Sequence, residues 1–270
     1  MNNIEFLQEK ARKIRIEALD MILKAGSGHI GGSFSVTDIL VALYYDVMYL
    51  AGDFSDHDRF ILSKGHANPA LYAILMDKGY VPQEAKYTLR QYGSPFQGHP
   101  DSKMCSFIDC TTGSLGHGIS IGVGMSLGFK KQGKKNRVFV VAGDGELDEG
   151  ICWEAFMAAA NFDLDNLTVV IDRNMIQLGE RTENLMRLGD LHDKMASFGF
   201  VVTEIDGHDF SELIVALKKE TPTTPHCIIA HTVKGKGVSF MEDAIAWHGC
   251  LPKGDQIVQA YNELQEYCHG

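Results

Sequence analysis

The sequence predicts an α/β fold in which a mainly parallel sheet is flanked by helices, with a helical part at the N-terminus. Four short apolar runs, at residues 137–142, 167–172, 201–207 and 226–232, alternate with segments of helical pattern. These runs are apolar along almost their whole length, as strands buried on both faces require. No repeat or low-complexity linker divides the 270 residues, so we expect residues 1–270 to form a single domain.

The elements follow one another in a clear order. Apolar residues recur at helical spacing in the first segment, which stops at Gly26. After the loop SGHIGGSFS, a second apolar helix is expected from about residue 36 to 49, with Ser35 as its N-cap. Residues 93–118 are rich in Gly, Ser, Pro and Thr, which favours loops. Further helices are expected at HGISIGVGMSLGFKKQ, at about 151–161, before 200 and at 211–220.

Composition excludes several classes of protein. The formal net charge of −10 argues against nucleic-acid binding, for which a basic stripe is typical. None of the six cysteines forms a C-x-x-C pair, so we expect free thiols in a reducing cytoplasm and no zinc site. We expect no signal peptide, and no apolar run approaches the roughly 18 residues of a membrane span.

The acidic stretch VFVVAGDGELDEG begins with the first of these strands, and four acidic residues lie in its second half. Asp144 comes directly after the strand, and Asn174 comes directly after the next strand along the chain. Ligands of open α/β sheets bind beyond the carboxyl ends of strands, so neighbouring strands would place both side chains in one crevice. Carboxylate and amide oxygens suit Mg²⁺ or Ca²⁺. The sequence therefore predicts a cation site with Asp144 as a ligand.

The same stretch favours a phosphate beside the cation. Gly143 and Gly145 leave room for a phosphate against the backbone, and the following helix presents its positive end. That helix end should also stabilise Glu146, Asp148 and Glu149. Two other phosphate motifs do not fit: no G-x-G-x-x-G comes after a strand, and GFKKQGKK lacks the required Ser or Thr and precedes a strand.

Further motifs resemble the transketolase family. GDG followed by NMI resembles its thiamine-diphosphate motif, and SGHIGG, RFILSKGHA, FQGHPD, TTGSLGHG, TVKGKGVSF and WHG match in order and spacing over almost the whole chain. The resemblance implies the thiamine-diphosphate-binding (PP) domain alone, as in the N-terminal subunit of split transketolases. The pyrimidine-binding and C-terminal domains are then expected on a separate chain.

The resemblance implies a role for each matching residue. Mg²⁺, or Ca²⁺ as a substitute, is expected on Asp144, Asn174 and the carbonyl of Ile176. Thiamine diphosphate is expected to lie against His66, Gly113, Ser114, Leu115, Gly143, Asp144, Gly145, Glu149, Asn174 and Ile176, with Glu149 also near a partner subunit. The residues expected over the reactive carbon are His29, His99 and His248. There a side-chain pKa near the operating pH would suit proton transfer.

Other residues are expected to be non-catalytic or to depart from the family pattern. The histidines set aside are His192, His208, His226, His231 and His269. Ile30 and Met175 stand where Pro and Gly are common, and His117 stands where a polar amide is common. These departures are compatible with an altered substrate.

The implied reaction is reversible transfer of a two-carbon ketol unit from a ketose phosphate to an aldose phosphate. Xylulose 5-phosphate is the expected donor, with a sulfonated or branched ketose as the alternative. Because the activating glutamate and most substrate-phosphate contacts belong to the missing domains, we expect activity only with a C-terminal subunit, in an α2β2 assembly. Two other functions stay open: a 2-oxo acid dehydrogenase type subunit, which FQGHPD and WHG argue against, and a cofactor-binding but non-catalytic subunit.

Overall fold

Five parallel strands form the central sheet of the computed structural model, which describes residues 3–50 and 56–267. The strands are β1 (Arg59–Leu62), β2 (Val138–Gly143), β3 (Leu167–Arg173), β6 (Val201–Asp206) and β7 (His226–His231), and their order across the sheet is β1-β2-β3-β7-β6. The α/β class with a parallel sheet is therefore confirmed. Cys268 and His269 lie outside the described residues.

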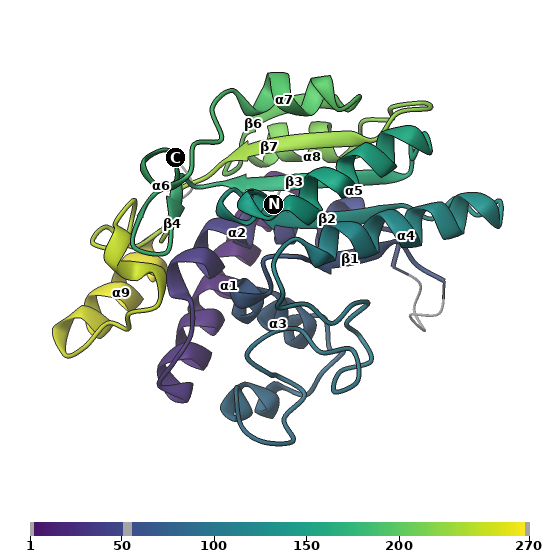
Figure 1. Cartoon of the computed structure of the whole chain (residues 1–270). Coiled ribbons are helices and arrows are strands. Elements are labelled where there is room, and N and C mark those ends of the chain that lie inside the picture. Colours follow the sequence, from purple (N-terminus) through teal and green to yellow (C-terminus); the bar gives the residue numbers. More distant parts are fainter. Residues whose placement is uncertain (1–2, 51–55, 268–270) are drawn as a thin grey trace.

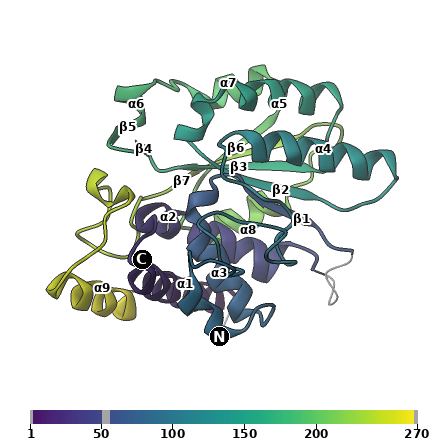
Figure 2. The ribbon, with the colours of Figure 1, turned by 60° about the horizontal axis from the view of Figure 1, so that its bottom comes forward.

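Helices cover both faces of the sheet, as Figures 1 and 2 show. One face carries α1 (Asn3–Ala25), α2 (Ile30–Ala42), α3 (Asn68–Asp77) and α8 (Phe210–Lys218), and the other carries α4 (His117–Lys131), α5 (Gly150–Asn161) and α7 (Leu191–Ser197). Strand residues alternate between the two cores: Phe139 and Val141 pack with the first group of helices, and Val140 packs with the second. This double burial is why β2, β3 and β7 are largely apolar runs, whereas the edge strand β6 is only partly buried and carries Glu204 and Asp206.

Shorter elements complete the chain. They are a π-helical turn (Leu43–Val47), the hairpin β4 (Ile176–Gln177) and β5 (Glu180–Arg181), α6 (Thr182–Leu185), α9 (Asp255–Glu266) and four 3₁₀ turns, at Gly65–Ala67, Gln83–Thr88, Gly145–Asp148 and Ile245–His248. The helix α9 packs against α1 through a small apolar cluster that includes Leu264. Among the described residues, no helix is both long enough and apolar enough to cross a membrane.

The expected start of the second helix was wrong. α2 begins at Ile30, with His29 in the N-cap position, and not near residue 36. The two glycines that suggested a loop lie inside the helix. Gly31 is needed there because a Cβ on it would lie 2.6 Å from the carbonyl oxygen of Trp247, whereas a Cβ on Gly32 would come no closer than 3.6 Å to its neighbours. Ser35 is therefore not an N-cap, and its hydroxyl instead donates to Asp172 at 2.7 Å.

The register of the sheet brings four strand ends to one edge. Gly143 at the end of β2 lies opposite Asp172 on β3, which in turn lies opposite Ala230 on β7. The expected neighbours are thus confirmed, since β2 pairs directly with β3. The segments after β1, β2, β3 and β7 all begin at this edge, which is where ligands of parallel sheets bind.

Candidate cofactor and active site

A cavity of about 360 Å³ lies beyond the carboxyl edge of the sheet. Most of the predicted site residues line it: His29, His66, His99, Gly113, Leu115, Gly143, Asp144, Gly145, Asn174, Ile176 and His248. Residues that were not predicted to belong to the site also line it: Gly32, Lys64, Glu146, Gln177, Leu178 and Lys234. The predicted metal ligands and the predicted catalytic histidines therefore share one enclosure.

Asp144 is held in place by the backbone around it. Its Oδ1 accepts a hydrogen bond from the Gly145 N–H at 2.8 Å, and its Oδ2 accepts one from the Met175 N–H at 2.7 Å. Burial, and then the charge of Asp172, raises the pKa of this carboxyl to about 6. A cation bound in the cavity would favour the ionised carboxylate, so this carboxyl is suited to metal binding.

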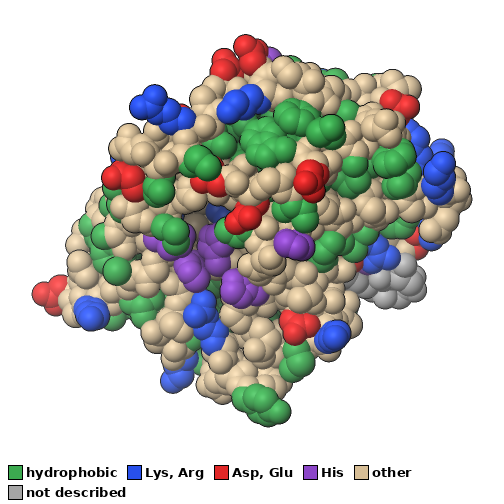
Figure 3. Space-filling view, in the orientation of Figure 1, with side chains coloured by type: hydrophobic (Ala, Val, Ile, Leu, Met, Phe, Trp, Pro, Cys, Tyr) green, Lys and Arg blue, Asp and Glu red, His purple; other side chains and the backbone are tan. Residues whose placement is uncertain are grey.

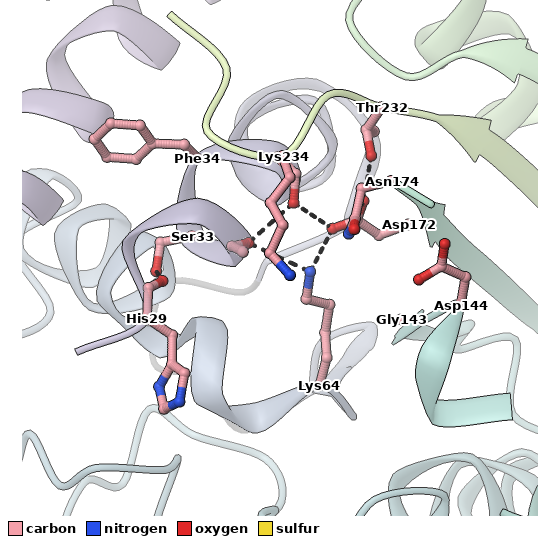
Figure 4. A network of polar contacts seen from close by, with 12 residues as sticks. His29, Ser33, Phe34, Lys64, Gly143, Asp144, Asp172, Asn174, Thr232 and Lys234 are labelled. Atoms are coloured by element: carbon pink, nitrogen blue, oxygen red, sulfur yellow. Dashed lines mark hydrogen bonds and ion pairs between the residues drawn. The ribbon is translucent and has the colours of Figure 1, made fainter. Parts of the chain in front are cut away.

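A buried ion pair stands beside Asp144. Lys64 Nζ donates to Asp172 at 2.5 Å, and both side chains are almost completely buried (Figure 4). Burial alone would raise the pKa of Asp172, but the charge of Lys64 and the hydrogen bonds from Lys64, Thr232 and Ser35 lower it. The carboxylate is thus ionised and fully partnered, and it holds the segment after β1 against the end of β3.

Lys234 connects the two ends of the cavity. Its Nζ donates to the carbonyl of Ile176 at 3.0 Å and lies 2.9 Å from Nδ1 of His248. Burial, and then the charge of Lys64, lowers the pKa of Lys234 to about 8. An ammonium next to the Ile176 carbonyl adds positive charge at a place where it would stabilise an anionic cofactor group. Lys64 and Lys234 lie in SKGHA and TVKGKG, two of the motifs noted in the sequence, but neither motif by itself indicates what its lysine contacts.

We call Lys64, Asp144, Asp172, Asn174, Ile176 and Lys234 the cavity floor. Asn174 belongs to it through its side chain, whose Oδ1 accepts from the Ile176 N–H at 3.2 Å and whose Nδ2 donates to Asp172 at 3.3 Å. No group of three or more His, Cys, Asp or Glu suited to a metal occurs among residues 3–50 and 56–267. A ligand set of one carboxylate, one amide oxygen and one carbonyl needs no such group.

Glu146 makes contacts beyond the helix start or interface that we expected it to favour. Its side chain is buried and accepts hydrogen bonds from the Gly116 N–H at 2.8 Å, the Gly143 N–H at 3.1 Å and the Ser63 hydroxyl. Burial nevertheless raises its pKa. Glu146 therefore joins three segments that border the cavity: the loop after β1, the end of β2 and the turn before α4.

We call His29, His66, His99 and His248 the histidine wall. The rings of His29, His66 and His248 lie 5.0 to 5.6 Å apart, and a Cβ on Gly113 would lie 3.2 Å from the ring of His99. Figure 3 shows histidine side chains gathered in a hollow of the surface.

The histidine wall differs from expectation in its pKa values. Burial, aided by nearby cations and histidines, lowers the pKa of His29 and of His248 to about 4 and the pKa of His66 well below its usual value; burial and Arg90 also lower that of His99. We expected pKa values near the operating pH. The imidazoles are instead neutral at pH 7, and each can both donate and accept a hydrogen bond.

A few predicted positions lie outside the cavity. Ser114 and His117 are exposed, and Glu149 is exposed at the N-cap of α5. Ile30 is buried in the cluster formed with Leu19 and Val238. The histidines set aside in the sequence analysis and described in the structure, His192, His208, His226 and His231, do not line the cavity.

The shape and polarity of the floor fit a metal-bound diphosphate. A Cβ on Gly145 would lie 2.7 Å from the Gln177 side chain, so only glycine keeps this approach open. The Oε1 of Gln177 is buried without a hydrogen-bond partner among the described residues. Met175 adopts φ 64°, the left-handed conformation that the glycine common at this position would adopt freely. The orphaned Gln177 oxygen is an acceptor that a bound cation or a donor group would satisfy, and the two lysines of the floor favour an anionic group beside it.

Fold and cavity together define an α/β protein with a cavity at the carboxyl edge of a parallel sheet. The model of the family described as transketolase, thiamine diphosphate binding domain, matches residues 7–266. The chain belongs to the transketolase family, a family of transferases, and corresponds to its thiamine-diphosphate-binding domain. The resemblance drawn from the motifs is thereby confirmed.

Several relatives have nearly the same length as this chain. An apulose-4-phosphate transketolase subunit of Phocaeicola vulgatus is 39% identical over 268 residues, which cover 97% of this chain and 95% of that protein. A 6-deoxy-6-sulfo-D-fructose transketolase subunit of a Clostridium species is 42% identical, with 96% of both chains covered. The solved transketolase of Campylobacter jejuni matches with a TM-score of 0.89 at 32% identity, but this chain covers only 43% of it.

Proposed function

We propose that this chain is the thiamine-diphosphate-binding subunit of a two-chain transketolase. The reaction is transfer of a two-carbon ketol unit from a ketose phosphate to an aldose phosphate. The observation that carries the proposal is that one cavity joins the cavity floor, with its three oxygen ligands, to the histidine wall. A metal site alone or a histidine cluster alone would support a broader range of functions.

The cavity floor would hold the cofactor by its diphosphate. Asp144, the Asn174 amide and the Ile176 carbonyl are hard oxygen donors, so we propose Mg²⁺ as the bridging ion, with Ca²⁺ as a substitute. Lys234 would stabilise the diphosphate charge. Gly145, which carries no side chain, would leave room for its oxygens.

The histidine wall would act on the sugar. When bound, thiamine diphosphate supplies a carbon nucleophile and an electron sink for the bond that is cleaved. Lys234 donates to Nδ1 of His248, which fixes the proton of that imidazole on Nε2 and makes Nε2 a donor. Neutral His29, His66 and His99 can bind sugar hydroxyls and pass a proton between oxygen atoms without first losing one to solvent.

A second polypeptide would complete the site. The chain spans less than half of the solved Campylobacter transketolase, and two relatives of matching length are named as subunits. We propose that a C-terminal subunit carries the pyrimidine-binding domain and that the assembly is α2β2. Exposed apolar side chains on α4 and α5, Ile121 and Met157, and Leu178 at the cavity, offer it an apolar surface. Glu149 at the start of α5 would meet that subunit.

The physiological donor is the open part of the proposal. Xylulose 5-phosphate, in a cytoplasmic pentose phosphate pathway, is the first candidate. A branched ketose phosphate or a sulfonated ketose is the second, because the names of two relatives state such substrates.

A reconstitution assay tests the proposal. This chain, a candidate C-terminal subunit and their mixture are each supplied with thiamine diphosphate and Mg²⁺, then with three donors: xylulose 5-phosphate, a branched ketose phosphate and a sulfonated ketose. We expect turnover by the mixture alone. Turnover of 2-oxo acids with an artificial electron acceptor, and of no ketose, would favour a dehydrogenase-type subunit. Cofactor binding without turnover of any donor would favour a non-catalytic subunit.

A further inference from the structure

Arg90 has an unusual backbone conformation at the rim of the cavity. It lies just after the turn Gln83–Thr88 and adopts φ 64°, a region that non-glycine residues rarely occupy. Its N–H donates to the Phe96 carbonyl at 2.8 Å, and the buried Phe96 ring stacks on Tyr72 at 4.2 Å. Such strain persists only where the surrounding structure holds it in place. The direction of the Arg90 side chain is therefore set by a packed loop.

That side chain reaches the histidine wall. Its Nη1 donates to the Ser27 hydroxyl at 3.4 Å, and its Nη2 lies 3.5 Å from Nδ1 of His29. Its Nε would lie 3.6 Å from a Cβ on Gly98, the residue before His99. The guanidinium thus sits beside two of the residues that we propose face the sugar.

Arg90 is exposed, whereas the two lysines of the floor are buried and their ammonium groups are bonded to groups that line or border the cavity. Lys64 is paired with Asp172, and Lys234 is bonded to the Ile176 carbonyl and to His248. Within the described part of the chain, the hydrogen bonds of the exposed Arg90 side chain go to neutral groups, and no ion pair includes it. Its fork of N–H donors therefore remains available to an anion from solvent.

We propose that Arg90 binds the tetrahedral oxyanion, phosphate or sulfonate, carried by the sugar substrate. A guanidinium offers two parallel N–H groups, which suit either oxyanion. This inference rests on the proposed function. It also assigns one substrate-phosphate contact to this chain, although we expected most such contacts on the missing domains. The rim of the cavity carries a cation without a counter-ion in the described residues, even though the chain as a whole is acidic.

The test compares charged and uncharged donors on the reconstituted two-chain enzyme. Arg90→Gln removes the charge, Arg90→Lys keeps the charge without the fork, and Lys135→Gln, an exposed cation near the amino end of β2, is the control. kcat/KM is measured for a ketose phosphate, a ketose sulfonate and the corresponding neutral ketose. We expect Arg90→Gln to lower kcat/KM by about 10- to 100-fold for the anionic donors, the usual cost of a lost charge-assisted hydrogen bond. Arg90→Lys should lose less.

The outcomes separate this inference from the proposed function. A loss at least tenfold larger for anionic donors than for the neutral donor supports it, and a loss for only one anion identifies the oxyanion that Arg90 binds. An equal loss for all donors would show that Arg90 only shapes the loop, and no loss would show a solvated surface arginine; both overturn the inference. Thermal unfolding and thiamine diphosphate titration of Arg90→Gln exclude misfolding as the cause. If the wild-type pair turns over no ketose, it is the proposed function that fails.

Discussion

The cavity floor is charged and the histidine wall is neutral, although both belong to one cavity. The floor consists of strand ends and the segments directly after them, and its charges are buried in pairs, such as Lys64 with Asp172. The wall lies mainly on loops, and its histidines are neutral because burial and neighbouring cations lower their pKa values. The floor is thus suited to hold a charged group still, and the wall to exchange hydrogen bonds with a neutral one.

This difference separates two kinds of failure. Damage to the floor should unfold the chain or release the cofactor, because its charges are buried and removing one leaves its partner uncompensated. Damage to the wall should leave the fold intact and slow the reaction, since its side chains are not part of the ion pairs that join the strand ends.

The largest expected effect on stability comes from breaking the buried pair. Lys64→Met removes the ammonium and leaves Asp172 with neutral donors only, which should lower the free energy of unfolding by about 3–5 kcal/mol. Urea unfolding followed by circular dichroism measures this. The double variant Lys64→Met/Asp172→Asn should be more stable than Lys64→Met; if the costs of the two substitutions simply add, the pair does not stabilise the floor as described.

A substitution in the wall should have the reverse signature. His99→Asn keeps hydrogen-bonding groups but removes the imidazole, so turnover of the reconstituted enzyme should fall about 100-fold or more, in the range typical of proton-transfer groups. The midpoint of thermal unfolding should stay nearly unchanged. The control is His192→Asn, on the exposed surface of α7. Full turnover by His99→Asn would show that the His99 imidazole has no role in the reaction.

Acid should weaken the fold through the wall. The pKa of His29 and of His248 is about 4 in the folded chain against an ordinary value of 6.5, so between these values the unfolded chain binds more protons. The free energy of unfolding should therefore fall as the pH drops from 7 toward 4. Urea unfolding at pH 7 and pH 5 checks this, and His29→Asn should reduce the difference. An unchanged difference would mean that His29 is not held neutral by the fold.

The smallest expected effect on stability comes from Met175, which lies beside the cavity floor. Met175 adopts φ 64° while its N–H binds Asp144, so Met175→Gly removes strain of the order of 1 kcal/mol at the cost of a more flexible unfolded chain. We expect the free energy of unfolding to change by less than about 1 kcal/mol. Met175→Val, β-branched in a left-handed conformation, should destabilise by more. Equal stability of both variants would contradict the strained conformation.

Much of the fold could be predicted from the sequence because the buried strands are apolar runs. The ends of β2 and β3 could also be placed at one edge, from the order of the strands along the chain. The start of α2 could not, since Gly31 is required by the approach of Trp247, which is distant in the sequence. Within the site, Asp144, Asn174 and the histidines stand out as polar groups after strands or between glycines. The role of Lys64 depends on its pairing with Asp172, and the pKa shifts of the wall depend on burial, neither of which a local pattern reveals.

The proposed function depends above all on whether the cavity floor holds thiamine diphosphate through a divalent cation. Calorimetric titration of thiamine diphosphate with Mg²⁺, into this chain mixed with its candidate C-terminal subunit, measures this directly. We expect tight binding by the mixture and a loss of about 100-fold in affinity with Asp144→Ala, while Asp193→Ala on exposed α7 should bind as the wild type does. Binding that survives Asp144→Ala unchanged would contradict the assignment of the floor, and the roles given to Asn174, Ile176 and Lys234 with it.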